Sequence, residues 1–134
     1  MNIRSITVLG LMLGLSLLSV ARAGPVVESA QTENNYLLGY IENSGCEFYR
    51  NGSWYDAKKA QAHLHDKYDY LAARNLISTA EDFIEKAATQ SSLSGKAYQV
   101  RCSNSDAVTS NQWLRDALAH YRSSFLVAGN AKTS

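Results

Sequence analysis

Two cysteines, Cys46 and Cys102, place the strongest constraint on how this chain folds, because they are the only two in 134 residues. No Cys-x-x-Cys spacing occurs and no histidine lies near either cysteine in sequence, so a redox or metal-binding pair is the weaker interpretation. A bridge between them would close a long loop, which the chain-entropy model values at about 4 kcal/mol. We predict this disulfide, provided that the chain reaches an oxidising compartment.

The first 23 residues predict export. Arg4 precedes the apolar run 6–20, and the run ends at Ala21-Arg22-Ala23, the order that is typical of a signal peptide cleaved after Ala23. The run is shorter than the roughly 20 residues that a membrane-spanning helix needs, so we expect no stable membrane insertion after cleavage. Residue 24, the first after the predicted cleavage site, is Gly, whereas bacterial lipoproteins have a lipid-modified cysteine at that position. The predicted location is the bacterial periplasm.

The exported part is predicted to form one domain over residues 31–126. A flexible lead at 24–30 and a disordered tail at 127–134 are expected at its ends, which are rich in small or polar residues. The precursor carries 13 basic and 12 acidic side chains, and cleavage would remove two basic ones. The nearly balanced, dispersed charge argues against nucleic acid as a partner. No cofactor is predicted.

Hydrophobic spacing and turn residues predict an α+β fold. Asn51-Gly52 between two aromatic-rich segments suits a type I′ turn and hence a β-hairpin, and residues 97–102 suit another strand. Helical spacing recurs in four segments, the third opened by a capping box from Ser78 to Glu81. We therefore expect about four helices packed on a small antiparallel sheet, the hairpin plus one strand, with one disulfide. The expected helices cover about 30–43, 57–72, 80–88 and 110–125.

Four motifs together resemble one known group of proteins. They are Arg-Asn-Gly at 50–52, Ala-x-x-Ala-x-x-His-Leu at 57–64, Thr-Ala-Glu-Asp-Phe-Ile at 79–84 and Ser-Ser-Leu-Ser-Gly-Lys at 91–96. By these four motifs the chain resembles the YfeK-like family of small periplasmic bacterial proteins, whose function is uncharacterised. The resemblance extends from about residue 48 to residue 121. The resemblance implies export and this fold, and it supplies no catalytic residues. Family members often have proline after Gly-Lys, where this chain has Ala97.

Four residues of one segment are candidate ligands for a metal ion: His63, His65, Asp66 and Asp69. At 100° per residue, His63 and His65 fall about 160° apart on a helix and cannot share one ion. His65 and Asp69 do face the same way, but the sequence places no further ligands beside them. We therefore predict no metal site, and a solvated or core-flanking role for these residues.

The sequence gives equally little support for a catalytic site. Glu81 and Glu85 lie one turn apart, as paired carboxylates could, but both are expected to face solvent, where nothing raises the pKa of a catalytic acid. His120 could approach a serine, yet there is no Gly-x-Ser-x-Gly elbow. We predict no catalytic residues.

Two segments are candidates for binding. In the hairpin, alternation should leave part of the aromatic set facing solvent near an arginine, although simple sheet packing is the alternative. In the loop at 91–96, hydroxyls, a glycine and an ammonium could converge on a phosphate or carboxylate, although a helix cap leading into a strand is the alternative. The candidate residues are Tyr49, Arg50, Trp54, Tyr55, Ser92, Ser94, Gly95 and Lys96.

The sequence favours a non-enzymatic module of the cell envelope that binds another protein or a cell-wall component through these two segments. A small hydrolase acting on a cell-wall component is one alternative, which a concave pocket gathering His, Glu or Ser side chains would favour. A secreted inhibitor or immunity-type protein is another, and it would present a protruding loop.

Overall fold

The computed structural model describes residues 29–131, and it confirms the α+β fold with four helices and one disulfide. The predicted signal peptide, its cleavage point and most of the predicted lead lie outside the described residues. Between residues 29 and 131, no helix is both long and apolar enough to cross a bilayer. The elements are α1 (Ala30–Glu42), β1 (Glu47–Arg50), β2 (Ser53–Asp56), α2 (Ala57–Ala72), α3 (Ala80–Ala87), β3 (Gln99–Arg101), β4 (Val108–Thr109) and α4 (Ser110–Ala131).

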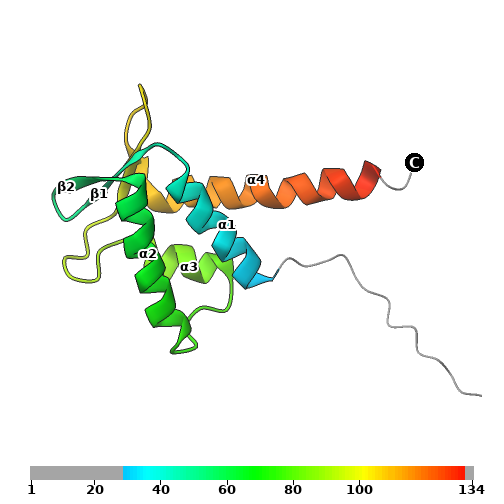
Figure 1. The fold of residues 1–134 in the computed structure, drawn as a ribbon, viewed down its shortest axis with the longest axis horizontal. Helices are drawn as coiled ribbons and strands as arrows, with labels where there is room; N and C mark the ends of the chain where they lie inside the picture. Colours follow the sequence, from blue (N-terminus) through cyan, green and yellow to red (C-terminus); the bar gives the residue numbers. More distant parts are fainter. Residues whose placement is uncertain (1–28, 132–134) are drawn as a thin grey trace, which may run out of the picture.

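The sheet is antiparallel throughout, in the order β2-β1-β3-β4. Figure 1 labels its β1–β2 hairpin. The predicted hairpin is present, with Asn51 at φ 49° and Gly52 at φ 89°, the positive values that a type I′ turn requires. Three strands were expected from the sequence. The fourth, β4, was missed because it is only two residues long and precedes a helix start.

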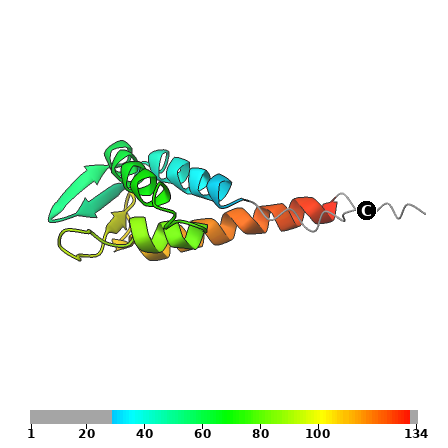
Figure 2. The ribbon, with the colours of Figure 1, turned by 90° about the horizontal axis from the view of Figure 1, so that it is seen from below.

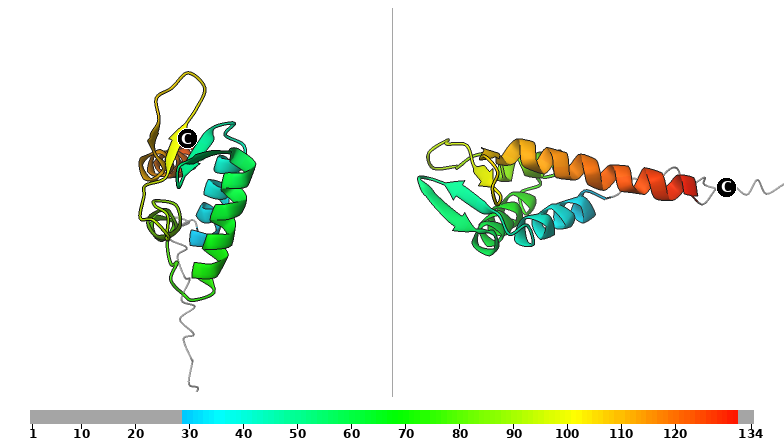
Figure 3. Two further views of the ribbon diagram at one scale, coloured as in Figure 1. Left: turned by 90° about the vertical axis from the view of Figure 1, so that its left-hand side faces the viewer. Right: turned by 90° about the horizontal axis from the view of Figure 1, so that it is seen from above.

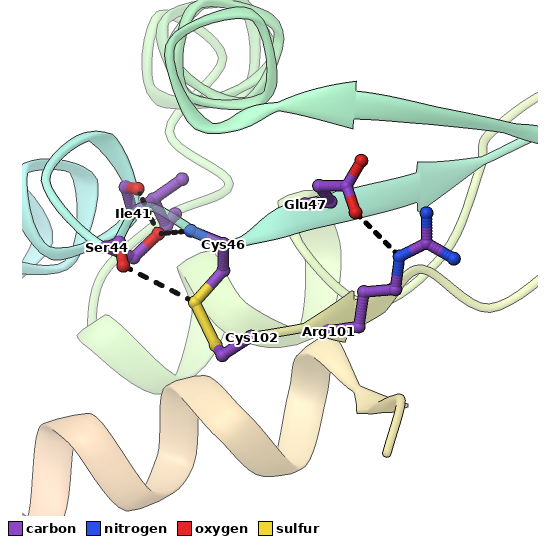
Figure 4. The surroundings of a disulfide bond; sticks show 6 residues. All are labelled: Ile41, Ser44, Cys46, Glu47, Arg101 and Cys102. Atoms are coloured by element: carbon purple, nitrogen blue, oxygen red, sulfur yellow. Dashed lines mark hydrogen bonds and ion pairs between the residues drawn. A yellow bond between two sulfur atoms is a disulfide. The ribbon is translucent and has the colours of Figure 1, made fainter. Parts of the chain in front are cut away.

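The predicted disulfide joins Cys46, just before β1, to Cys102, just after β3 (Figure 4). Beside it, the Ser44 hydroxyl donates to the Ile41 carbonyl at 2.8 Å and accepts from the Cys46 amide at 3.2 Å. This chain of hydrogen bonds connects the end of α1 to the start of β1. The bridge therefore fastens one end of the β1–β3 pair and α1 beside it.

The core lies where the four helices meet the sheet. Helix α1 contacts all three other helices, and α4 packs on α3 and on strands β3 and β4. All four helices and the strands β1 and β3 contribute buried apolar side chains, whereas β2 and β4 contribute none. The large side chains that are almost completely buried are Phe83, Leu37, Ile41, Ile84, Leu114 and Val100.

Two predicted boundaries are wrong. Helix α3 is capped by Thr79, whose hydroxyl accepts from the Asp82 amide, and not by Ser78. The Asp82 carboxylate accepts in return from the Ser78 amide, so the capping pair lies one residue later than expected. Helix α4 continues to Ala131, into the segment expected to be disordered, and its C-terminal half projects beyond the other helices (Figures 1 and 2).

Candidate functional site

A pocket of about 200 Å³ lies between the hairpin and the first half of α2. The hairpin stands at one end of the molecule, opposite the free end of α4 (Figure 3). The wall is largely aromatic and apolar, with several polar tips, and we call this cavity the hairpin pocket. Its lining residues are Phe48, Tyr49, Arg50, Tyr55, Lys59, Ala60, His63, Leu64, Tyr98 and Ser110.

The polar centre of the hairpin pocket is formed by Arg50, His63 and Tyr98. One Arg50 nitrogen, Nη1, lies 2.9 Å from Nδ1 and 3.2 Å from Nε2 of His63, and Nε2 lies 3.3 Å from the Tyr98 hydroxyl. Because a guanidinium can only donate, at least one His63 nitrogen must be unprotonated to accept from it. Either tautomer of the neutral imidazole provides such an acceptor.

The surroundings of His63 favour its neutral form. Burial lowers the pKa of His63 most, and the positive charges of Arg50 and Lys67 lower it further, while Asp66 acts weakly in the opposite direction. Burial also raises the pKa of the Tyr98 hydroxyl. At neutral pH the centre of the hairpin pocket therefore holds a guanidinium beside a neutral imidazole and a neutral phenol.

A buried hydroxyl in the same pocket, that of Ser110, lacks a hydrogen-bond partner in the described part of the chain. The Ser110 side chain is 1% exposed, and its Oγ makes no hydrogen bond to any residue of the described chain. The Ser110 backbone amide donates to the Tyr98 carbonyl at 2.9 Å, which holds this first residue of α4 against the pocket. Buried polar groups without a partner are rare and call for an explanation.

Three of the four predicted hairpin candidates, Tyr49, Arg50 and Tyr55, are among the residues that line the hairpin pocket. The strand register places Arg50 and Tyr55 on one face of the hairpin, and the Arg50 guanidinium lies 5.0 Å from the centre of the Tyr55 ring. On the other face Tyr49 pairs with Trp54, their ring centroids 5.4 Å apart, and Trp54 does not line the pocket. Its ring instead receives the Arg101 guanidinium at 3.9 Å.

The predicted loop candidates do not line the hairpin pocket, but the loop touches the hairpin. The Ser94 hydroxyl donates to the Asn51 side chain in the hairpin turn. The Ser91 hydroxyl accepts from two amides of its own loop, including Ser94, and Gly95 takes a positive φ of 70°. Ser92 and Lys96 are exposed. The Ser91 and Ser94 hydroxyls that could have met an anion therefore close the loop itself.

Sequence reasoning missed Lys59, Tyr98 and Ser110 as pocket residues, and it considered His63 only as a metal ligand. His63 and His65 diverge as expected, since His65 is exposed and lies 3.6 Å from Asp69. Within residues 29–131, no group of three or more His, Cys, Asp or Glu side chains could hold a metal ion. The sequence offered one signal for this site: His63 and Arg50 each belong to a motif that carries the family resemblance, His63 to the motif at 57–64 and Arg50 to the motif at 50–52.

The residues that the sequence offered as possible catalytic groups do not line the hairpin pocket; they are Glu81, Glu85 and His120. Glu81 accepts hydrogen bonds from Arg122, which lower the pKa of its carboxyl, the opposite of what a catalytic acid needs. Glu85 accepts from Arg115 at 3.1 Å. His120 is exposed on α4.

Comparison with known proteins gives the family. A model of a family of unknown function, DUF5329, matches residues 28–122. The chain belongs to this family.

The chain is also 38% identical over 65 residues to the uncharacterized protein YfeK of Salmonella typhimurium, a match that covers 48% of this chain and 52% of YfeK. The chain thus spans about half the length of that relative. No solved structure matches the chain. The resemblance inferred from the sequence motifs is confirmed.

Proposed function

We propose that this protein is a non-enzymatic binding module of the bacterial cell envelope, and that the hairpin pocket holds part of its ligand. The observation that carries the proposal is the Ser110 hydroxyl, which is buried against the pocket and has no hydrogen-bond partner among residues 29–131. A polar group of another molecule would satisfy it. The aromatic and apolar wall with a few polar groups is the usual composition of a small-molecule site.

The disulfide supports the envelope as the place of action. Disulfides form and persist in oxidising compartments such as the periplasm, and they are rare where cytosolic reductants act. Cys46 and Cys102 are both used in the bridge, so the described chain has no free thiol. The predicted signal peptide is the second argument for export.

The hairpin pocket also contains a serine and a histidine, which a hydrolase would need. However, Ser110 makes no hydrogen bond to His63, and the imidazole faces Arg50 where a catalytic base would need a carboxylate. A guanidinium at that position opposes the positive charge that His63 would have to take up as a base. These contacts favour binding over hydrolysis.

Filling the hairpin pocket tests the proposal. Ala60 lines the pocket on α2 and is 9% exposed, so Ala60→Leu should occupy the cavity while leaving the fold intact. The probes are benzyl alcohol, benzamide, benzoate and phenyl phosphate, added to isotope-labelled protein and followed by amide chemical shifts. We expect shifts concentrated at the pocket residues in the wild type and their loss in Ala60→Leu.

The matched control is Ala62→Leu, which makes the same change at an exposed position of the same helix. It should bind the probes as the wild type does. Thermal melts of both variants establish that they are folded. The proposal is wrong if no probe perturbs the pocket amides, or if Ala60→Leu binds as well as Ala62→Leu.

A further inference from the structure

We infer that the group held in the hairpin pocket is an oxyanion, a carboxylate or a phosphate, carried on a body no larger than about one ring. The inference rests on the proposed function and adds the chemical class of the ligand. Among the ten residues that line the pocket, three side chains are basic, those of Arg50, Lys59 and His63, and none is acidic. The cavity therefore offers positive charge and donors without a carboxylate to neutralise them.

Of the four other arginines within residues 29–131, three pair with carboxylates, and the fourth, Arg74, donates to the Tyr70 carbonyl and lies over the Tyr70 ring. Arg101 pairs with Glu47, and Arg115 pairs with Glu85. Arg122 pairs with two glutamates. Within residues 29–131, neither Arg50 nor Lys59 has such an ion pair, although Arg50 is partly buried.

The guanidinium of Arg50 keeps donors free for an oxyanion. Its Nη1 is directed at His63, whereas Nη2 and Nε make no hydrogen bond within the described residues. Two parallel N–H groups of a guanidinium match the two oxygens of a carboxylate or phosphate. The Ser110 hydroxyl supplies a further buried donor in the same cavity.

The size and walls of the cavity limit the rest of the ligand. At about 200 Å³, the hairpin pocket is smaller than the roughly 300–1,000 Å³ of sites that enclose drug-sized molecules. Phe48, Leu64 and the rings of Tyr55 and Tyr98 form its apolar surface. One ring or a short chain therefore fits beside the anionic group.

An oxyanion in the pocket would also change the protonation of His63. The groups that act on this imidazole are Arg50 from β1, Lys67 and Asp66 from α2, and the Tyr98 hydroxyl. Burial and then the two cations lower the pKa of His63 in the free protein, and an added negative charge would favour the imidazolium and raise that pKa. Oxyanion binding is therefore coupled to proton uptake, so affinity increases as the pH falls below neutral.

A charged probe and its neutral isostere test the inference. Benzoate and benzamide have nearly the same shape, and phenyl phosphate replaces the carboxylate with a phosphate. From a charge-assisted hydrogen bond we expect benzoate to bind at least about tenfold more tightly than benzamide. The His63 ring protons should titrate at a higher pH with benzoate bound. Comparing benzoate with phenyl phosphate then identifies the preferred oxyanion.

Two substitutions locate the effect. Arg50→Met should abolish the preference for benzoate over benzamide, while Arg115→Met, the same change at an exposed ion-paired position, should keep it. Lys59→Gln, at an exposed side chain of α2, should weaken benzoate binding a few-fold and leave benzamide unchanged. This second variant keeps the test valid if Arg50→Met does not fold.

The outcomes separate the two proposals. Equal affinity for benzoate and benzamide would overturn the oxyanion inference and leave the binding pocket standing. A benzoate preference that persists in folded Arg50→Met would also overturn it. Failure of every ring probe to perturb the hairpin pocket would remove the proposed function, and the inference with it.

Discussion

Two arginines, Arg122 on α4 and Arg50 on β1, occupy polar clusters of opposite kinds. Arg122 donates four hydrogen bonds to Glu33 and Glu81, and so links α4 to α1 and α3. Arg50 faces a neutral imidazole and has no carboxylate partner within residues 29–131. We call the Arg122 cluster, with Glu33 and Glu81, the complete cluster, because carboxylates of the chain accept its hydrogen bonds. In the Arg50 cluster, Nη2 and Nε make no hydrogen bond within the described residues. The difference separates a group that holds the fold together from one that is available to a ligand.

The largest expected effect follows the loss of the complete cluster. Arg122→Met would leave the Glu33 carboxylate, 7% exposed, without its cation. Because Arg122 itself is 44% exposed and water replaces part of its role, we expect a loss of about 2 kcal/mol in the free energy of unfolding, less than for a fully buried pair. Urea denaturation measures it, and Arg50→Met should change stability by no more than about 0.5 kcal/mol. Equal losses in the two variants would contradict the comparison.

Two buried serines, Ser91 and Ser110, extend the comparison, with an expected loss of unfolding free energy about half as large. The Ser91 hydroxyl accepts from the Leu93 and Ser94 amides, so Ser91→Ala should cost about 1 kcal/mol of unfolding free energy. Ser110→Ala removes a hydroxyl with no partner in the described chain, so it should cost nothing or stabilise slightly. Both variants can be measured in one denaturation series. A clear loss in Ser110→Ala would mean that its hydroxyl is already satisfied in the free protein.

The smallest effect is in the pH dependence of stability. The pKa of His63 is lowered by burial and by Arg50, so the unfolded chain binds this proton more readily than the folded one. Stability should therefore decrease as pH falls below the unfolded value of about 6.5, and level off below the folded pKa, a change we expect to stay under about 1 kcal/mol. His63→Gln should remove this dependence.

The complete cluster should respond in a different pH range. The hydrogen bond from Arg122 lowers the pKa of Glu81, so its contribution is present above the unfolded value of 4.5 and is lost as pH falls through the folded pKa. Glu81→Gln should remove this acid dependence and leave the dependence near neutrality. If both variants changed the same pH range, the two clusters would not titrate independently.

The elements that the sequence predicted correctly depend on local signals. Asn51-Gly52 defines the hairpin turn, and Asp56 caps α2 by accepting from the Lys59 amide at 2.8 Å. The two cysteines permit one pairing within the chain. The error at the start of α3 is local too, because Ser78–Glu81 and Thr79–Asp82 have the same spacing and differ only in which hydroxyl meets an amide.

The hairpin pocket could not be predicted in the same way. Its polar centre brings together Arg50, His63 and Tyr98, which are 13 and 35 residues apart in successive pairs. At 100° per residue His63 and His65 diverge, as the structure shows, but this angle does not determine which side chain His63 contacts. Ser110 gave no signal, because it follows the capping residue Thr109 and is an ordinary helix-start residue.

The link between Cys46 and Cys102 makes the folded chain a covalent ring with two arms. Strands β1 to β3, α2, α3 and the whole hairpin pocket except Ser110 belong to the ring, while α1 and α4 are the arms. A protease that cuts one peptide bond in the ring, for example in the exposed turn at Asn75, produces a nicked molecule whose two pieces remain attached. Only a cut together with reduction of the disulfide separates the two pieces, so proteolysis alone opens the ring without dividing the molecule.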